Sequence, residues 1–189
     1  MKQAMLVRMV VVVFFIAYPF IVYFGIKNLP PSFFGLFLIV LVALRFGVLV
    51  PDEKLILWPV LLVFLGYAIA TTILDSAPML LFYPALVNFV LCAVFANSLR
   101  YEEPLLLRIV RARGFVISKY TPRYLYRLTA LWAGFFALNG LISIWTSTLS
   151  LEAWTLYNGL ISYFIVAILI GGELLFRRRY KKRMGVENP

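Results

Sequence analysis

The sequence contains no histidine, and its one cysteine, Cys92, lies inside an apolar run. A single cysteine cannot form a disulfide within the chain, and the lack of histidine excludes histidine-ligated metals and Ser–His or Cys–His nucleophiles. Charged residues make up only 14% of the sequence, against roughly 25% in soluble proteins. These shortages exclude a water-soluble globular enzyme, and no cofactor is implied.

Apolar residues are abundant instead. They make up 63% of the 189 residues, and a helix that crosses a bilayer needs ~20 of them. We therefore predict an all-α integral membrane protein, one polytopic domain of residues 1–189 with six transmembrane helices. The predicted spans cover residues 5–26, 32–50, 55–74, 79–99, 128–148 and 154–176. Pro59 is expected in the first turn of the third span, and Asp75 as the cap of the turn before the fourth.

The distribution of positive charge predicts the topology. With an inside amino terminus, 17 of the 18 lysines and arginines face inward and only Lys27 faces outward. The positive-inside rule then places both termini, the loop 100–127 and the basic tail 177–189 in the bacterial cytoplasm. The net charge of +10 thus indicates the inner membrane and its anionic lipids rather than nucleic acid. We name the following residues the basic face: Arg100, Arg108, Arg111, Arg113, Lys119, Arg123, Arg127, Arg177, Arg178 and Arg179.

The loop between the fourth and fifth spans contains a predicted amphipathic helix. Pro104 suits its first turn, the acids Glu102 and Glu103 favour its positive end, and Gly114 suits its exit. The expected apolar positions are Leu105, Leu106, Ile109 and Val110. We expect this short helix to lie in the inner membrane interface. Its cations either follow from topology and anionic lipid or form a dock for an acidic soluble partner.

Several polar residues fall inside the predicted spans. Asn88 lies in the fourth span, and the sequence Asn-Gly-Leu-Ile-Ser occurs twice, at Asn139–Ser143 and Asn158–Ser162. An amide in lipid seeks a partner, and a neighbouring glycine permits close approach. A short turn joins the last two spans, so these spans must pack antiparallel. We therefore expect the depths of Asn139 and Asn158 in the membrane to differ by no more than about one helical turn. They either hold helices together or line a path for a head group or acyl thioester.

Glu173 is the one acid at membrane depth, and Arg177 follows it at the spacing of a helical ion pair. Such a carboxylate is a functional candidate by default, although this one lies near the cytoplasmic end of its span. An anchoring ion pair and a functional acid are both open interpretations.

Prolines interrupt two of the predicted spans. Pro19 and Pro84 each follow a tyrosine, and each deprives the carbonyl four residues earlier of its helical donor. The two kinks should lie at similar depth, and they either enclose a vestibule or reflect the tolerance of membrane helices for proline. Gly66 and Ala70 offer a seam of small residues that would suit a homodimer.

A series of motifs, each weak by itself, resembles in its order along the chain a family of small, largely uncharacterised bacterial inner-membrane proteins. The matching stretches are Tyr18-Pro19 with Val22–Gly25, Tyr83–Asn88, Arg123-Tyr124, Arg127–Thr129, Trp132, Phe135-Phe136, Asn139-Gly140, Trp154, Leu156–Gly159, Tyr163 and Gly172-Glu173. The resemblance implies a genetic setting among acyl-carrier-protein, ketosynthase and acyltransferase genes, including those for aryl-polyene, xanthomonadin-like pigments. It departs at residues 108–119, where the family is usually more proline-rich, and it implies no reaction.

Three functions follow as hypotheses. The first is a non-enzymatic component that organises or tethers acyl-carrier-protein-dependent lipid or aryl-polyene synthesis, with the basic face receiving the acidic carrier. The second is a small transporter or flippase for an acyl-chain product. The third is an intramembrane acyltransferase or hydrolase, which the missing histidine disfavours.

Overall fold

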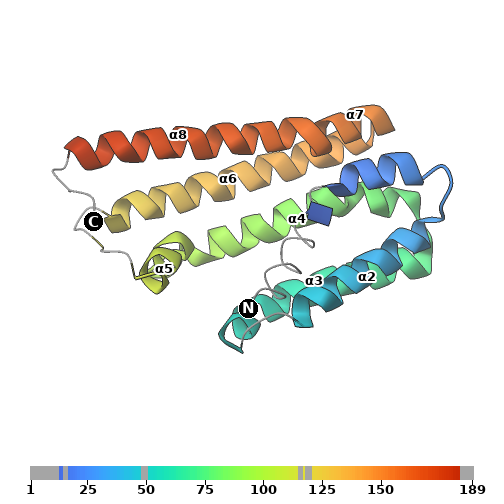
Figure 1. Ribbon diagram of the computed structural model, residues 1–189, viewed down its shortest axis with the longest axis horizontal. Coiled ribbons are helices and arrows are strands. Elements are labelled where there is room, and N and C mark those ends of the chain that lie inside the picture. Colours follow the sequence, from blue (N-terminus) through green and yellow to red (C-terminus); the bar gives the residue numbers. More distant parts are fainter. Residues whose placement is uncertain (1–12, 15–16, 48–50, 115–116, 118–120, 184–189) are drawn as a thin grey trace. The chain divides into compact units, whose positions relative to one another are not determined.

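The computed structural model describes residues 13–14, 17–47, 51–114, 117 and 121–183, with side chains described outside 44–57 and 178–183. Every regular element in these ranges is a helix (Figure 1). Residues 17–25 are helical and precede the labelled elements. These are α2 (Pro31–Gly47), α3 (Pro51–Leu74), α4 (Ala77–Ser98), α5 (Leu105–Ala112), α6 (Thr121–Ser147), α7 (Leu151–Leu156), the π-helix η1 (Tyr157–Ile161) and α8 (Ser162–Arg183).

Three stretches of the described chain are long and apolar enough to cross a membrane: Ala77–Ser98, Thr121–Ser147 and Leu151–Arg177. Two shorter apolar helical stretches cover Pro31–Ala43 and Trp58–Leu74. The prediction of an all-helical protein with membrane-spanning helices is confirmed to this extent. Residues 5–12 and 15–16 of the first predicted span, 5–26, lie outside the described residues, and the count of six spans with both termini inside stays a prediction.

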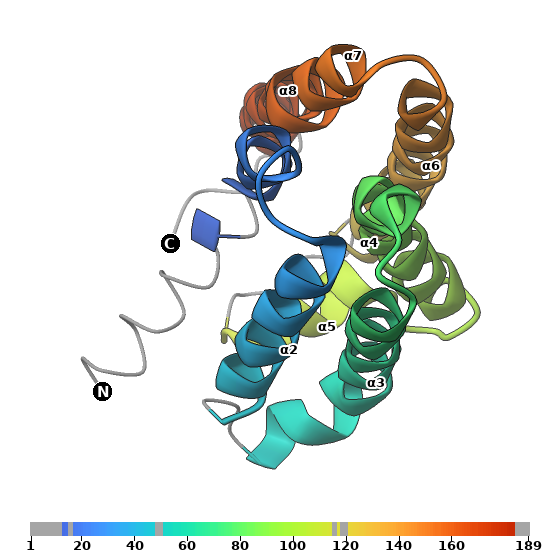
Figure 2. The same ribbon diagram turned by 90° about the vertical axis from the view of Figure 1, so that its right-hand side faces the viewer.

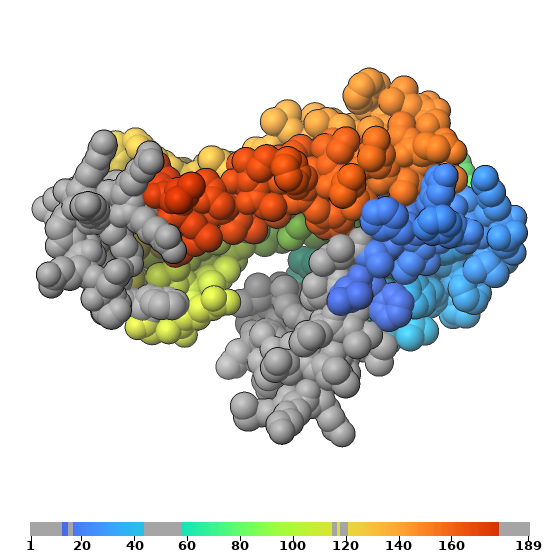
Figure 3. All heavy atoms as spheres, turned by 45° about the horizontal axis from the view of Figure 1, so that its top comes forward, coloured from blue at the N-terminus to red at the C-terminus, as the bar shows by residue number. Residues whose placement is uncertain are grey.

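The exposed surface of α8 has the character expected of a lipid-facing helix. Large apolar side chains along its length are exposed, including Phe164, Ile168 and Leu175. In the space-filling view of Figure 3 this helix forms part of the surface, coloured orange to red. A helix that is apolar all round is stable where its outer face meets hydrocarbon rather than water.

The chain divides into two compact units. The first comprises Met1–Tyr83 and Ser143–Gly159, and the second comprises Pro84–Ile142 and Leu160–Pro189. The helices α4 and α6 and the π-helix η1 each contribute residues to both units.

In the first unit, α2 and α3 lie side by side (Figure 2). Gly35 of α2 permits their close approach, because a Cβ atom at this position would lie 2.7 Å from the backbone nitrogen of Thr72. Phe34 and Leu38, close to Gly35 in α2, are buried, and so is Ala68, one helical turn before Thr72 in α3. Gly66 of α3, part of the predicted homodimer seam, has open space around it.

Asp75 caps a different helix from the one that the sequence indicated. Its carboxylate Oδ1 accepts a hydrogen bond of 2.6 Å from the backbone nitrogen of Ser32, in the first turn of α2. Asp75 has a positive φ of 44°, a conformation that aspartate tolerates better than most residues. The expectation that Asp75 caps the turn before α4 was therefore wrong, and the residue joins the end of α3 to the start of α2.

Several helices are longer than the spans predicted within them. Helix α3 begins at Pro51, so Pro59 lies inside it rather than in its first turn. Helix α6 begins at Thr121, within the predicted loop 100–127, and α8 continues to Arg183, within the predicted tail. Hydropathy marks the apolar part of a helix, whereas the helix itself continues beyond it through polar residues. Pro122 is compatible with the earlier start of α6, because proline in a first turn removes no intrahelical hydrogen bond.

Candidate functional site

The carbonyl groups in the first turns of α4 receive hydrogen bonds from side chains of other elements. The hydroxyl of Tyr18 donates to the carbonyl of Leu80 at 3.2 Å. Because Pro84 has no N–H, the Leu80 carbonyl lacks its usual helical donor, and Tyr18 replaces it. The indole Nε1 of Trp154 donates to the next carbonyl, that of Leu81, at 2.8 Å. The Tyr67 hydroxyl donates to the Met79 carbonyl in the same stretch.

The two Tyr-Pro pairs of the sequence meet in the first unit. The ring centroids of Tyr18 and Tyr83 lie 4.4 Å apart, and only 1% and 4% of these residues' surfaces are exposed. This contact agrees with the expectation that the two kinks lie at a similar depth. One interpretation of the sequence placed a vestibule at these kinks. In the structure the rings of Tyr18 and Tyr83 are in contact there. Trp154, which is fully buried, was not identified from the sequence as a partner of this cluster.

Asn88 and Asn139 form a buried pair between α4 and α6. The Asn139 Nδ2 donates to the Asn88 Oδ1 at 2.9 Å. The Asn88 Nδ2 in turn donates to the Pro84 carbonyl at 2.8 Å. Gly140 makes room for this pair, because a Cβ there would lie 3.0 Å from the Phe89 ring and 3.3 Å from the Asn88 Cβ. Both amides thus have partners within the second unit.

Asn158 belongs to a separate buried group in the first unit. Its Oδ1 accepts a hydrogen bond of 2.7 Å from the Ser143 hydroxyl, and its Nδ2 donates to the Trp154 carbonyl at 3.0 Å. The π-helix η1, which begins one residue earlier, holds Asn158 and Gly159. A Cβ at Gly159 would lie 2.8 Å from the ring of Phe20. The absence of a side chain at Gly159 therefore leaves room for the Phe20 ring.

The two copies of Asn-Gly-Leu-Ile-Ser make different contacts. The serine of the first copy, Ser143, binds the asparagine of the second, Asn158. Asn139 lies one helical turn before Ser143 and pairs with Asn88 instead. In both copies the close neighbour of the glycine is a phenylalanine ring rather than another backbone. The sequence identified the polar residues, and the structure supplies their partners.

Glu173 joins α8 to the first turns of α6. Its Oε1 accepts a hydrogen bond of 2.8 Å from the Tyr124 hydroxyl and lies 3.5 Å from Arg177 Nε. The ring of Tyr124 also stacks on that of Phe176, with centroids 6.1 Å apart. The ion pair at helical spacing was predicted, whereas the contribution of Tyr124 was not. A carboxylate with these two partners is well suited to anchor one helix end to another.

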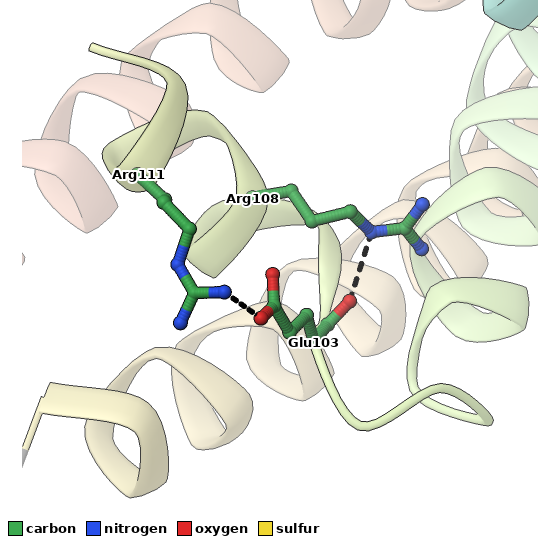
Figure 4. Close-up of polar contacts among 3 residues, drawn as sticks. All are labelled: Glu103, Arg108 and Arg111. Carbon is green, nitrogen blue, oxygen red and sulfur yellow. Dashed lines mark hydrogen bonds and ion pairs between the residues drawn. The ribbon is translucent and has the colours of Figure 1, made fainter. Parts of the chain in front are cut away.

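The arginines of the basic face whose side chains are described are exposed: Arg100, Arg108, Arg111, Arg113, Arg123, Arg127 and Arg177. Lys119 lies outside the described residues, as do the side chains of Arg178 and Arg179. Glu103 engages two of these arginines (Figure 4). Its carboxylate pairs with Arg111, and its carbonyl accepts a hydrogen bond of 2.9 Å from Arg108 Nε.

Helix α5 is attached to the end of α4. The Ser98 hydroxyl accepts a hydrogen bond of 3.1 Å from the backbone nitrogen of Leu105, the first residue of α5. Gly114, with a φ of 75°, follows the helix as the sequence indicated. Leu107, which was not among the expected apolar positions, is the buried residue of α5, and Ile109, which was among them, is exposed. Periodicity alone could not show which flank of so short a helix meets the protein.

A cavity of about 360 Å³ lies between α2 and α3 in the first unit. Its lining consists of apolar side chains: Val42, Ala43, Trp58, Leu61, Leu62 and Leu65. The sequence gave no indication of it. Such a surface offers van der Waals contact to hydrocarbon but no acid, base or nucleophile.

Comparison with family models, with curated proteins and with solved structures finds no match to this chain. The resemblance to carrier-associated inner-membrane proteins therefore stands on the sequence motifs alone.

Proposed function

We propose that this chain is a non-enzymatic, six-span protein of the bacterial inner membrane whose basic face docks an acidic acyl carrier protein. In this role it would hold carrier-dependent lipid or aryl-polyene synthesis at the membrane. The motif resemblance supports the biosynthetic setting, and the apolar helices support the membrane location.

The exposed arginines at the start of α6 carry this proposal. Arg123 and Arg127 lie one helical turn apart, and both are exposed. Leu125, between them in sequence, is buried, and Tyr124 is bonded to Glu173 of α8. These contacts fix the rotation of the helix, so the two guanidinium groups are presented together on one flank. A pair of fixed cations is suited to the carboxylates of an acidic partner.

The hydrogen bonds of the polar residues in the predicted spans favour a structural role for these residues. Asn88 and Asn139 are bonded to each other, and Asn158 is bonded to Ser143. Amides that satisfy one another hold helices together and are poorly placed to line a transport path or activate a nucleophile. This favours docking over the flippase and over the acyltransferase or hydrolase.

Capture of purified acyl carrier protein by the detergent-solubilised full chain tests the proposal. Arg123→Glu should lower the carrier affinity about tenfold, because it replaces a favourable charge pair with a repulsive one. Lys27→Glu is the matched control, since it makes the same change in net charge at an exposed residue outside the basic face. Equal affinity of the two variants, or no capture by the unaltered chain, would refute docking at this face.

A further inference from the structure

Arg108 is held in a defined orientation at the start of α5. Its Nε donates to the Glu103 carbonyl at 2.9 Å, and its guanidinium carbon lies 5.2 Å from the centroid of the Tyr101 ring. Figure 4 shows the two terminal nitrogens of Arg108 pointing away from Glu103. A guanidinium fixed in this way presents two parallel N–H donors, which is the geometry that binds a phosphate through two oxygens.

The position of α5 along the chain indicates where such a phosphate would come from. Helix α4 is one of the stretches long enough to cross a membrane, and it ends at Ser98. The hydrogen bond from Leu105 to Ser98 holds the first residue of α5 at that end. If α4 spans the bilayer, α5 therefore lies at the depth of the lipid head groups. The exposed Ile109 beside Arg108 is consistent with a helix at an interface between lipid and water.

We propose that Arg108, with Arg111 one turn away, forms a binding site for the phosphate of an anionic phospholipid head group. This inference does not rest on carrier docking: Arg108 and Arg111 belong to the basic face, but Arg123 and Arg127 carry the docking proposal, and the ligand here is a lipid head group.

Glu103 limits the strength of this site. Its carboxylate pairs with Arg111, whose side chain is 56% exposed. The Arg111 guanidinium is then occupied and less able to bind a further oxygen of the phosphate held by Arg108. The backbone carbonyl of Glu103, rather than its carboxylate, orients Arg108. Replacing the carboxylate by an amide should thus release Arg111 while leaving Arg108 in place.

Native mass spectrometry of the full chain in detergent, with added phosphatidylglycerol or phosphatidylcholine, tests the site. The unaltered chain should retain phosphatidylglycerol in preference. Arg108→Lys should weaken this retention about fivefold to tenfold, because lysine keeps the charge but cannot make the two parallel contacts. Arg113→Lys is the matched control and should retain the lipid unchanged, since Arg113 is an exposed arginine just beyond α5.

A second pair of variants tests the role of Glu103 and does not depend on a loss of binding. Glu103→Gln should strengthen phosphatidylglycerol retention several-fold, and Glu102→Gln, which makes the same charge change at an exposed neighbour, should have a much smaller effect. Equal retention by Arg108→Lys and Arg113→Lys would overturn the proposal, as would equal retention of the two lipids. Equal gains from Glu102→Gln and Glu103→Gln would overturn the role assigned to Glu103.

Discussion

The hydroxyl of Tyr18 donates its hydrogen bond to the carbonyl of Leu80, the acceptor that Pro84 leaves without a helical donor. Tyr18 and Leu80 are 62 positions apart in the chain and are both buried. One Tyr-Pro motif therefore compensates the backbone defect that the other introduces.

Removal of this hydroxyl should destabilise the protein. Tyr18→Phe keeps the ring against Tyr83 but leaves the Leu80 carbonyl without this donor. We expect the free energy of unfolding in detergent to fall by about 0.6–2 kcal/mol, the range for a hydrogen bond between membrane helices. Unfolding in mixed micelles of increasing denaturing detergent measures the change.

The partner variant makes this expectation specific. Pro84→Ala restores an N–H group that can donate to the Leu80 carbonyl within α4. In the Pro84→Ala background, Tyr18→Phe should lower the free energy of unfolding much less than it does with Pro84 present. The difference between these two losses is the coupling energy of Tyr18 and Pro84. Equal costs with proline and with alanine at position 84 would show that the tyrosine hydroxyl does not compensate for the proline.

The pair of Asn88 and Asn139 should stabilise the contact of α4 with α6. Replacement of either residue by leucine removes the hydrogen bond between the two side chains, so each single variant should lose about 1 kcal/mol. The double variant should lose less than the sum of the two, because each single variant already removes the same hydrogen bond. Unfolding of the four proteins of this cycle gives the coupling energy.

Asn97 provides the control for that cycle. It lies on α4 like Asn88 but is exposed near the end of the helix. Asn97→Leu should leave the free energy of unfolding nearly unchanged. An additive Asn88 and Asn139 cycle, or an equal loss from Asn97→Leu, would contradict the assigned pairing.

Glu173 should act as an anchor rather than as an acid. Glu173→Gln keeps an oxygen that can accept from Tyr124 and loses only the ion pair with the half-exposed Arg177, so it should cost less than about 1 kcal/mol. Glu173→Ala loses both contacts and should cost more. Carrier capture should survive Glu173→Gln, whereas an intramembrane enzyme that uses this acid would lose turnover.

The helical character of the chain and several local features could be predicted from the sequence. Apolar runs identified the long helices, and Gly114 indicated where α5 ends. The pairing of Glu173 with Arg177 followed from helical spacing. These features depend on residues close together in the chain, where spacing determines geometry.

The partners between helices could not be predicted in the same way. Periodicity shows which residues share a face, but it does not show which helix that face meets. Asp75 therefore capped α2 instead of the neighbouring α4, and Trp154 bonded the carbonyl of Leu81, 73 positions away. For the same reason Leu107, rather than Ile109, proved to be the buried side chain of α5.

The central claim is that the chain crosses the membrane with its basic face in the cytoplasm. Two exposed positions test it: Ala112, the last residue of α5, which precedes α6 in the chain, and Thr148, which directly follows α6. Each is changed to cysteine in a Cys92→Ala background and treated with a membrane-impermeant maleimide. In intact spheroplasts Thr148→Cys should be labelled, and Ala112→Cys should be labelled only after the membrane is permeabilised. Labelling of Ala112→Cys in intact spheroplasts would place the basic face outside and contradict the account.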